Sequence, residues 1–258
     1  MIITRMGALE QHLDDWPWPA ASRYSTETVQ DVLLVCEHAS AFIPPVLNDL
    51  NLSEAARYSH AAWDIGAHDL ATALADQMSA PLILGAISRL VYDCNRPPEA
   101  ADSIPAQSEV FAVPGNADLT SSGRAARARR IHDPFHATVA KALQTGQPTT
   151  CLVTIHSFTP IYHGQMRDLD IGYIFEGDDR LATAVLAQTL RRGAHKAALN
   201  EPYCGADGVT HTLKLHAQDR PHVMIEVRND LIDTPAKAAR IAKDLAADLQ
   251  AARAEITG

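Results

Sequence analysis

The feature that most constrains the fold of this chain is the alternation of short, continuously apolar runs with segments of helical spacing. The predicted strands are residues 31–36, 81–86, 89–93, 151–156, 171–175 and 222–227. Several of these runs are apolar at consecutive positions, so we expect strands that are covered on both faces. Such an alternation predicts an α/β fold, a three-layer sandwich whose central sheet is mixed and mostly parallel.

Helical patterns lie between these runs. The predicted helices are residues 66–78, 123–144, 179–193 and 234–255. Pro134 falls inside the second of them and should kink it or split it in two, because proline cannot donate the backbone hydrogen bond of a helix interior. The last begins with Thr234 and Pro235, a favourable N-cap and first-turn pair. Residues 95–122 lack clear periodicity, and a segment of that length in a compact domain is more often functional than idle.

Size and charge limit the classes of function. The chain has 258 residues, of which 47% are hydrophobic, and we expect a single domain over residues 1–258. The net charge of −9 argues against a nucleic-acid-binding protein and against a polybasic membrane contact. An anionic small substrate stays possible, because local arginines can outweigh the overall charge. The sequence leaves the oligomeric state open between a monomer and a homodimer.

Cysteine usage and the absence of long apolar segments favour a cytoplasmic protein. Residues 1–30 carry acids and prolines without a long apolar run, so no signal peptide is expected. No stretch approaches the roughly 18 apolar residues that span a bilayer. The four cysteines are widely spaced and form no CxxC pair. We expect reduced thiols that act as small hydrophobic side chains.

Polar residues follow several of the predicted strands where each strand ends. These residues are Glu37 and His38 after the first, Asn95 and Arg96 after the third, His156 and Ser157 at the fourth, and Glu226 in the last. Chemistry in α/β sheets gathers at the carboxyl ends of the strands. Asp64 adds a further acid just before a predicted helix, where its default role is that of an N-cap.

Two histidines and a carboxylate on separate loops are typical of a catalytic zinc site. Three protein ligands leave a fourth position for water, whose pKa falls toward about 7. Glu226 is the carboxylate that could complete the deprotonation, since an acid in an apolar strand is costly unless it is paired or used. An arginine beside the metal could bind an anionic substrate group with two hydrogen bonds.

Other sites have less support in the sequence. The segment "HDPFH" (132–136) has two histidines at helical spacing, but it lacks the glutamate of a metalloprotease motif, and Pro134 distorts the spacing. His163, His211, His216 and His222 have no partner spacing and are interpreted as surface or loop residues. No glycine-rich phosphate-binding motif and no nucleophile elbow follows any strand, which argues against a nucleotide-binding protein and a serine hydrolase.

Taken together, several segments resemble the N-formylglutamate amidohydrolase family, which is similar at a distance to the zinc carboxypeptidases and aspartoacylases. They are "CEHAS" (36–40), "AWDIGA" (62–67), "SRLVYDCNRP" (88–97), "IHSFTP" (155–160), "RDLDIG" (167–172), "EPY" (201–203) and "IEVRNDLI" (225–232). The resemblance runs through most of the chain. It implies a zinc carboxypeptidase-like (phosphorylase/hydrolase-like) fold and one Zn²⁺ ion per chain.

The resemblance also implies roles for individual residues. His38 and His156 would be zinc ligands, and Glu226 would be the general base and then the acid. Asn95 and Arg96 match a pair that binds a substrate carboxylate. Arg89 and Arg167 are further candidates for anion binding, and Ser157 for a hydrogen bond beside the metal.

The third zinc ligand departs from the carboxypeptidase pattern, because Ala41 stands where that pattern has a glutamate. Asp64 is our choice for it. Glu37 is the alternative, although adjacent residues on a strand end point to opposite faces.

The resemblance implies hydrolysis of an N-acyl acidic amino acid, most of all N-formyl-L-glutamate. Family membership does not fix the substrate. Another N-acyl amino acid or a small peptide is an alternative. A non-catalytic protein that binds anionic small molecules is a second alternative, from a different class.

Overall fold

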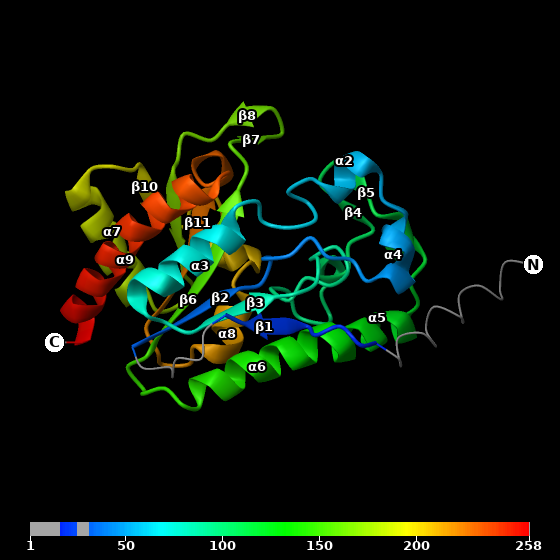
Figure 1. Ribbon diagram of the computed structural model, residues 1–258, viewed down its shortest axis with the longest axis horizontal. Helices are drawn as coiled ribbons and strands as arrows, with labels where there is room; N and C mark the ends of the chain where they lie inside the picture. Colours follow the sequence, from blue (N-terminus) through cyan, green and yellow to red (C-terminus); the bar gives the residue numbers. More distant parts are fainter. Residues whose placement is uncertain (1–15, 25–30, 258) are drawn as a thin grey trace, which may run out of the picture.

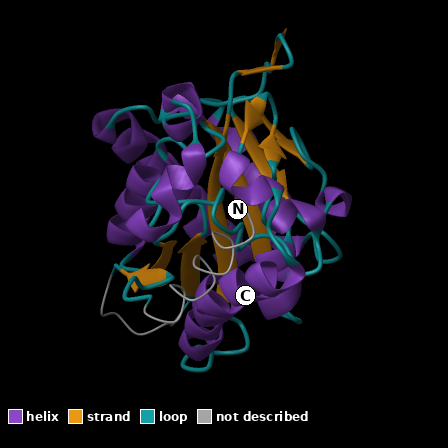
Figure 2. Ribbon diagram, turned by 90° about the vertical axis from the view of Figure 1, so that its right-hand side faces the viewer, coloured by secondary structure: helices purple, strands orange, loops and turns teal. Residues whose placement is uncertain are grey.

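A twisted seven-stranded sheet forms the centre of the protein in a computed structural model, which describes residues 16–24 and 31–257 (Figure 2). Its strands are β1 (Ala21–Arg23), β2 (Val32–Cys36), β3 (Leu82–Gly85), β6 (Cys151–Phe158), β9 (Ile171–Ile174), β10 (Ala197–Leu199) and β11 (His222–Arg228), in the order β1-β3-β2-β6-β11-β9-β10. β1 is antiparallel to β3, and β9 to β11, whereas the other neighbours are parallel. The predicted mixed, mostly parallel sheet is confirmed.

Helices cover both faces of this sheet, so the predicted three-layer arrangement is also confirmed (Figure 1). One face carries α3 (Ala67–Met78), α7 (Arg180–Arg192) and α9 (Pro235–Thr257), and the other carries α6 (Asp133–Leu143) and α8 (His211–His216). The helices expected from residues 66–78, 179–193 and 234–255 correspond to α3, α7 and α9. The short α8 was not predicted.

Strand β2 shows why its residues had to be apolar at every position. Val32, Leu34 and Cys36 pack with α3, α7 and α9, while Leu33 and Val35 pack in the cluster on the other face. All five side chains are buried. Each strand residue therefore loses its contact with water, whichever face it points to.

The predicted strand at residues 89–93 is wrong, because this segment is a chain of turns. The Ser88 hydroxyl donates to the carbonyl oxygen of Ala62 and accepts from the amide of Leu90, and the amide of Val91 donates to Ser88. The bonds from Leu90 and Val91 close within the turn, and the bond from Ser88 ties the turn to the segment before α3, so none of them requires a partner strand. The segment is apolar because it is buried, and burial alone does not distinguish a strand from a packed turn.

The helix predicted at residues 123–144 is interrupted, as Pro134 indicated. It consists of α5 (Ser121–Arg127), a π-helical turn η3 (Ala128–His132) and α6, and Pro134 lies in the first turn of α6. A proline is tolerated there because the amide it lacks would have no partner within the helix.

Short elements make up most of the remaining structure. They are η1 (Pro45–Asn51), α2 (Glu54–Arg57), η2 (Ala101–Ser103), β4 (Gln107–Ser108), β5 (Phe111–Ala112), α4 (Pro114–Ala117), β7 (Ile161–Tyr162), β8 (Gln165–Met166), η4 (Gly205–Asp207) and η5 (Asn229–Leu231). The segment 95–122, in which no periodicity was found, holds four of them.

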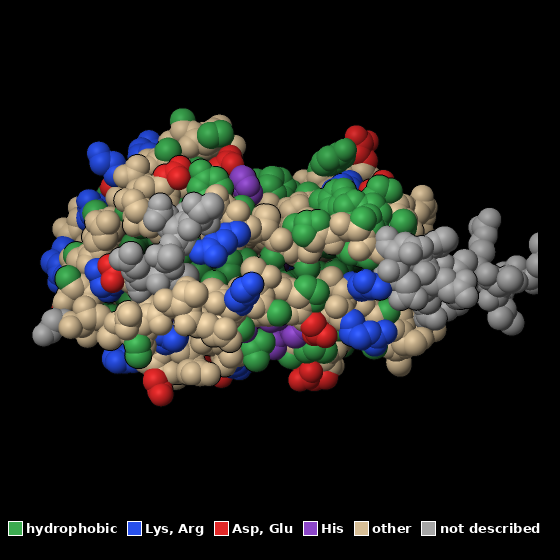
Figure 3. Space-filling model, turned by 60° about the horizontal axis from the view of Figure 1, so that its bottom comes forward, with side chains coloured by type: hydrophobic (Ala, Val, Ile, Leu, Met, Phe, Trp, Pro, Cys, Tyr) green, Lys and Arg blue, Asp and Glu red, His purple; other side chains and the backbone are tan. Residues whose placement is uncertain are grey.

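Three further features of the described residues concern the charged surface, the helices and the cysteines. On the face in Figure 3, lysine and arginine side chains are interspersed with acidic ones rather than gathered. Among the described helices, none is long and apolar enough to cross a bilayer. All four cysteines are free, and Cys36, Cys94 and Cys151 are buried. Most of residues 1–30, where no signal peptide is expected, lies outside the described residues.

Candidate active site

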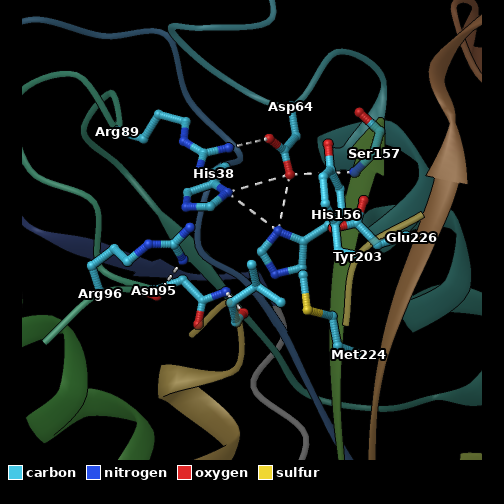
Figure 4. A pocket seen from close by; sticks show the side chains of 11 residues that line it. His38, Asp64, Arg89, Asn95, Arg96, His156, Ser157, Tyr203, Met224 and Glu226 are labelled. Carbon is cyan, nitrogen blue, oxygen red and sulfur yellow. Dashed lines mark hydrogen bonds and ion pairs between the residues drawn. The ribbon is translucent and has the colours of Figure 1, made fainter. Parts of the chain in front are cut away.

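Three buried side chains meet at the carboxyl ends of β2 and β6, and each can bind a metal ion (Figure 4). The Nδ1 atom of His156 lies 2.9 Å from the Oδ2 atom of Asp64, and the Nδ1 atom of His38 lies 3.3 Å from the same oxygen. The two Nδ1 atoms are 3.2 Å apart. One ligand atom from each residue thus points at a common centre, which is the arrangement of a three-ligand zinc site.

The backbone explains how residues distant in sequence converge there. His38 follows β2 by two residues, and His156 lies on the neighbouring strand β6. The amide of Asp64 donates to the carbonyl oxygen of His38, which fixes the approach to α3 beside the end of β2. The N-cap of α3 is Gly66, and no side chain caps this helix. The default interpretation of Asp64 as a helix cap is therefore wrong, and its carboxylate is free to face the two histidines.

Each histidine also has a carboxylate at its outer nitrogen. Asp93 Oδ1 lies 2.7 Å from His38 Nε2, and Glu37 Oε2 lies 3.1 Å from His156 Nε2. The first pair is a hydrogen bond, whereas the second is an ion pair without hydrogen-bond alignment. A carboxylate on the outer nitrogen keeps the proton there and leaves the inner lone pair for a cation, as in many metal sites. The alternative ligand Glu37 lies on this outer side of His156.

The charges of the site fit a cation. Burial opposes a charge on Asp64, but His38 and His156 together with Arg89 hold the pKa of its carboxyl group far below the usual value. Burial likewise disfavours an imidazolium at His156, yet Glu37 and Asp64 raise the pKa of this imidazole well above its ordinary value. The carboxylates around the histidines thus attract a positive charge, which protons supply when no metal ion is bound.

Glu226 lies next to this centre. In the parallel pairing of β11 with β6 it stands opposite His156, so both side chains leave the sheet on the same face. Its Oε2 atom is buried and has no hydrogen-bond partner among the described residues. Burial and the charge of Asp64 raise the pKa of Glu226 to about 7, although His156 opposes the shift. A carboxylate of this kind can both accept and return a proton near neutral pH.

These residues line a small cavity of about 130 Å³ that opens to solvent. The lining residues are His38, Asp64, Arg89, Asn95, Arg96, His156, Ser157, Tyr203, Val209, Met224 and Glu226. The cavity therefore contains every predicted site residue except Arg167.

The arginines differ in what they bind. Arg89 donates to Asp64 Oδ1 at 3.2 Å and to Asp93 Oδ2 at 2.7 Å, so it holds the two acids of the centre in place. Arg96 donates through Nε to Asp102 and through Nη1 to the carbonyl oxygens of Asn95 and Gly208. Its Nη2 atom makes none of the hydrogen bonds found in the described part of the chain. Of the two arginines that line the cavity, Arg96 is therefore the one with a guanidinium nitrogen that none of these hydrogen bonds uses.

The contacts of Asn95, Ser157 and Arg167 are mainly with neighbouring backbone and side chains of the protein. The Asn95 amide donates to the carbonyl oxygen of Val209 and accepts from the backbone of Thr212, which ties the cavity wall to α8. The Ser157 hydroxyl donates to the backbone of the segment before α3. Arg167 lies 4.3 Å over the ring of Tyr162 and contacts the Tyr203 hydroxyl at 3.4 Å, behind the cavity.

Four residues of the centre or its cavity were not singled out from the sequence: Asp93, Tyr203, Val209 and Met224. Asp93 carried a usable signal, since it is an acid inside the apolar run "LVYDC". An acid in such a run is expected to have a partner. Tyr203 lies in the segment "EPY" (201–203), which carries part of the family resemblance. Val209 and Met224 have no polar side chain that would mark them in the sequence.

Gly85 sets the position of the β2 end that carries Glu37 and His38. A Cβ atom at Gly85 would lie 1.9 Å from the carbonyl oxygen of Glu37, so the backbone at residue 37 would have to move. We expect Gly85→Ala to lower the free energy of unfolding by about 1–3 kcal/mol, the usual cost of overpacking. It should also weaken zinc binding. Chemical denaturation and a zinc titration measure the two effects.

Gly164→Ala is a control for the loss of a glycine, because a Cβ atom there meets nothing within 4 Å, although its φ of 77° is unfavourable. It should leave zinc affinity unchanged. Equal zinc affinity in the wild type and Gly85→Ala would contradict the role given to Gly85.

Comparisons with known proteins identify the family and the fold of the chain. The family model described as N-formylglutamate amidohydrolase matches residues 30–233. No curated protein matches the chain. A solved gene product of Agrobacterium tumefaciens is 42% identical, with a TM-score of 0.89 over 93% of this chain and 97% of that one.

An N-formylglutamate amidohydrolase from Ralstonia eutropha is 18% identical, with a TM-score of 0.66 over 91% of this chain and 97% of that one. This second likeness is one of fold. The family match extends from just before β2 to just beyond β11 and so includes the three residues that meet at the centre, together with Glu226. The chain is an amidohydrolase that belongs to the N-formylglutamate amidohydrolase family.

Proposed function

We propose that this protein is a zinc-dependent hydrolase for the amide bond of an N-acyl acidic amino acid, and that N-formyl-L-glutamate is its substrate, with formate and L-glutamate as products. The observation that carries the proposal is the convergence of His38, Asp64 and His156 beside the unpartnered carboxylate oxygen of Glu226. The family of the chain supports the same reaction class.

Zinc fits the residues that would hold it. His38 and His156 would bind through Nδ1, and Asp64 through a carboxylate oxygen, with Asp93 and Glu37 behind the two imidazoles. Zinc accepts such nitrogen and oxygen ligands and leaves a position open in catalytic sites. When bound, the ion would polarise a carbonyl oxygen and lower the pKa of a coordinated water molecule.

Glu226 performs the proton transfers in this proposal. It accepts a proton from the water molecule that attacks the formyl carbon, and the new C–O bond forms. When the C–N bond breaks, Glu226 returns the proton to the departing nitrogen, which leaves as the amine of glutamate. A pKa near neutrality suits both roles of this carboxyl group.

The cavity also offers groups for the carboxylates of the substrate. Arg96 has a free donor atom, and the Asn95 side chain lies beside it on the same loop. Arg89 keeps Asp64 in the orientation that a metal needs. We place the two remaining candidates further out, with Ser157 at the edge of the centre and Arg167 acting through Tyr203.

Arg96→Ala is expected to raise the KM for N-formylglutamate about 10- to 100-fold with a smaller change in kcat. A hydrogen bond to a charged group is worth about 1.5–3 kcal/mol, and about 1.4 kcal/mol corresponds to a tenfold change. Arg96→Lys keeps the charge without the planar fork and should recover part of the affinity. An unchanged KM in Arg96→Ala would remove Arg96 from the substrate site.

A panel of N-acyl amino acids tests the substrate. Amine release should be fastest with N-formylglutamate, slower with N-formylglutamine, which lacks the side-chain carboxylate, and slower again with N-acetylglutamate, whose acyl group is larger. Faster release from a neutral N-acyl amino acid or a dipeptide would overturn the proposed substrate while leaving the reaction class intact.

A further inference from the structure

Four histidines gather on the α6 side of the sheet, away from the centre formed by His38, Asp64 and His156. His132 ends the π-helical turn η3, and His136 lies one turn later in α6. His211 and His216 are the first and last residues of α8. The interpretation of His211 and His216 as isolated surface or loop residues is therefore wrong, because α8 packs against α6 and brings the four rings together.

The ring nitrogens of this histidine cluster lie at distances that a metal ion can bridge. The Nε2 atoms of His132 and His211 are 3.1 Å apart. One nitrogen from each of His132, His136 and His211 lies within 4.8 Å of the other two. His216 Nε2 is 2.9 Å from His136 Nδ1. Ligands of one tetrahedral zinc ion, each about 2.0–2.1 Å from it, must themselves lie within about 4 Å of one another.

Hydrogen-bond acceptors next to His132 and His136 fix which nitrogen of each ring carries the hydrogen. Asp133 Oδ1 lies 2.9 Å from His132 Nδ1, and the carbonyl oxygen of Cys94 lies 2.9 Å from His136 Nε2. A carboxylate and a carbonyl oxygen only accept hydrogen bonds, so both of these nitrogens carry hydrogen. The lone pairs are then on His132 Nε2, which faces His211, and on His136 Nδ1, which faces His216. Carboxylate or carbonyl groups orient metal-binding histidines in the same way.

We propose that His132, His136 and His211 form a second metal site, which binds a divalent transition-metal ion of the zinc class. Imidazole nitrogens suit zinc, copper, nickel and iron rather than magnesium or calcium. His211 is the half-buried member of the three and gives the ion a route from solvent.

The site would join α6 to α8. Asn95 accepts from the backbone of Thr212 in α8, next to His211, and Cys94 contacts His136. An ion here would therefore fix the wall of the cavity that carries Asn95. The role we infer is structural, since none of the three ligands lines the cavity that holds the atoms assigned to the reaction.

Metal content after dialysis against zinc tests the proposal, with elemental analysis as the readout. The wild type should bind two ions per chain. His211→Ala should bind one ion, and so should the double variant His38→Ala/His156→Ala. The triple variant His38→Ala/His156→Ala/His211→Ala should bind none. His68→Ala removes a histidine that is about half exposed and lies on α3, and should still bind two ions.

A second readout separates loss of the site from loss of the fold. In the double variant His38→Ala/His156→Ala, Co²⁺ should give a visible absorption spectrum that adding His132→Gln abolishes while the far-ultraviolet circular dichroism stays unchanged. One zinc ion in the wild type, or two in His211→Ala, would overturn the second site. In that case the histidines would be a buried hydrogen-bonded cluster.

Discussion

Glu226→Gln is expected to lower kcat for N-formylglutamate hydrolysis by about 10³-fold, within the range of about 10²–10⁴ that general acid–base catalysis contributes. Glutamine keeps the shape of the side chain but can no longer accept a proton from water. The rate of amine release at saturating N-formylglutamate measures kcat. Zinc content should match that of the wild type, because Glu226 is outside the group of candidate ligands.

Substrate binding should survive this change, since the binding groups of the cavity lie on other loops. Titration calorimetry should therefore detect binding of N-formylglutamate to Glu226→Gln and give its Kd, because the variant does not turn the substrate over. Glu255→Gln is the matched control, because Glu255 is an exposed glutamate on α9. A kcat within tenfold of the wild type would show that another group moves the proton. The same pair of measurements separates an enzyme from a protein that only binds anions.

His156→Ala is expected to weaken zinc binding at the active site by at least about 100-fold. The apparent binding free energy of structural zinc is about 10–16 kcal/mol for four ligands, or about 3 kcal/mol for each. Loss of the imidazole also leaves Asp64 and Glu37 as buried carboxylates without this partner. We expect the thermal stabilisation by added zinc to decrease as well, because ligand binding to the native state raises its stability.

Glu37→Gln provides an intermediate case. It removes the charge behind His156 Nε2 and should weaken zinc binding about 10- to 100-fold, as removal of such outer partners usually does. His68→Ala should have no effect. If Glu37→Gln weakened zinc binding as much as His156→Ala, Glu37 would be a direct ligand, which is the alternative that the sequence left open. Unchanged zinc affinity in His156→Ala would refute the proposed centre.

Much of the fold could be predicted because local patterns decide it. A strand such as "VLLVC", which is apolar at every position, must be buried on both faces, and this requirement implies a sheet that lies between two layers of helices. Pro134 marked the break in a helix for a reason that holds in any context. The strand predicted at residues 89–93 is wrong because the same burial can be met by turns whose hydrogen bonds close locally. The sequence pattern records burial but leaves the backbone partner undefined.

Part of the candidate site could also be read from the sequence. His38, His156 and Glu226 follow or occupy predicted strands, and parallel strands end at one edge of a sheet, so their proximity was expected. Asp64 was less certain, since an acid before a helix normally caps it. Its orientation depends on the backbone bond to His38 and on Gly66 taking the cap position.

The sequence by itself therefore determined the layered α/β architecture and the residue types at the strand ends, because periodicity and strand direction are local properties of the chain. Only the tertiary structure decided which carboxylate faces the histidines, which acids lie behind them, and that α8 brings His211 to His132. These contacts join residues far apart in the sequence: His38 and Asp64 are separated by 26 residues, His132 and His211 by 79, and His38 and His156 by 118. No local pattern encodes them, since they depend on how packed elements are placed relative to one another.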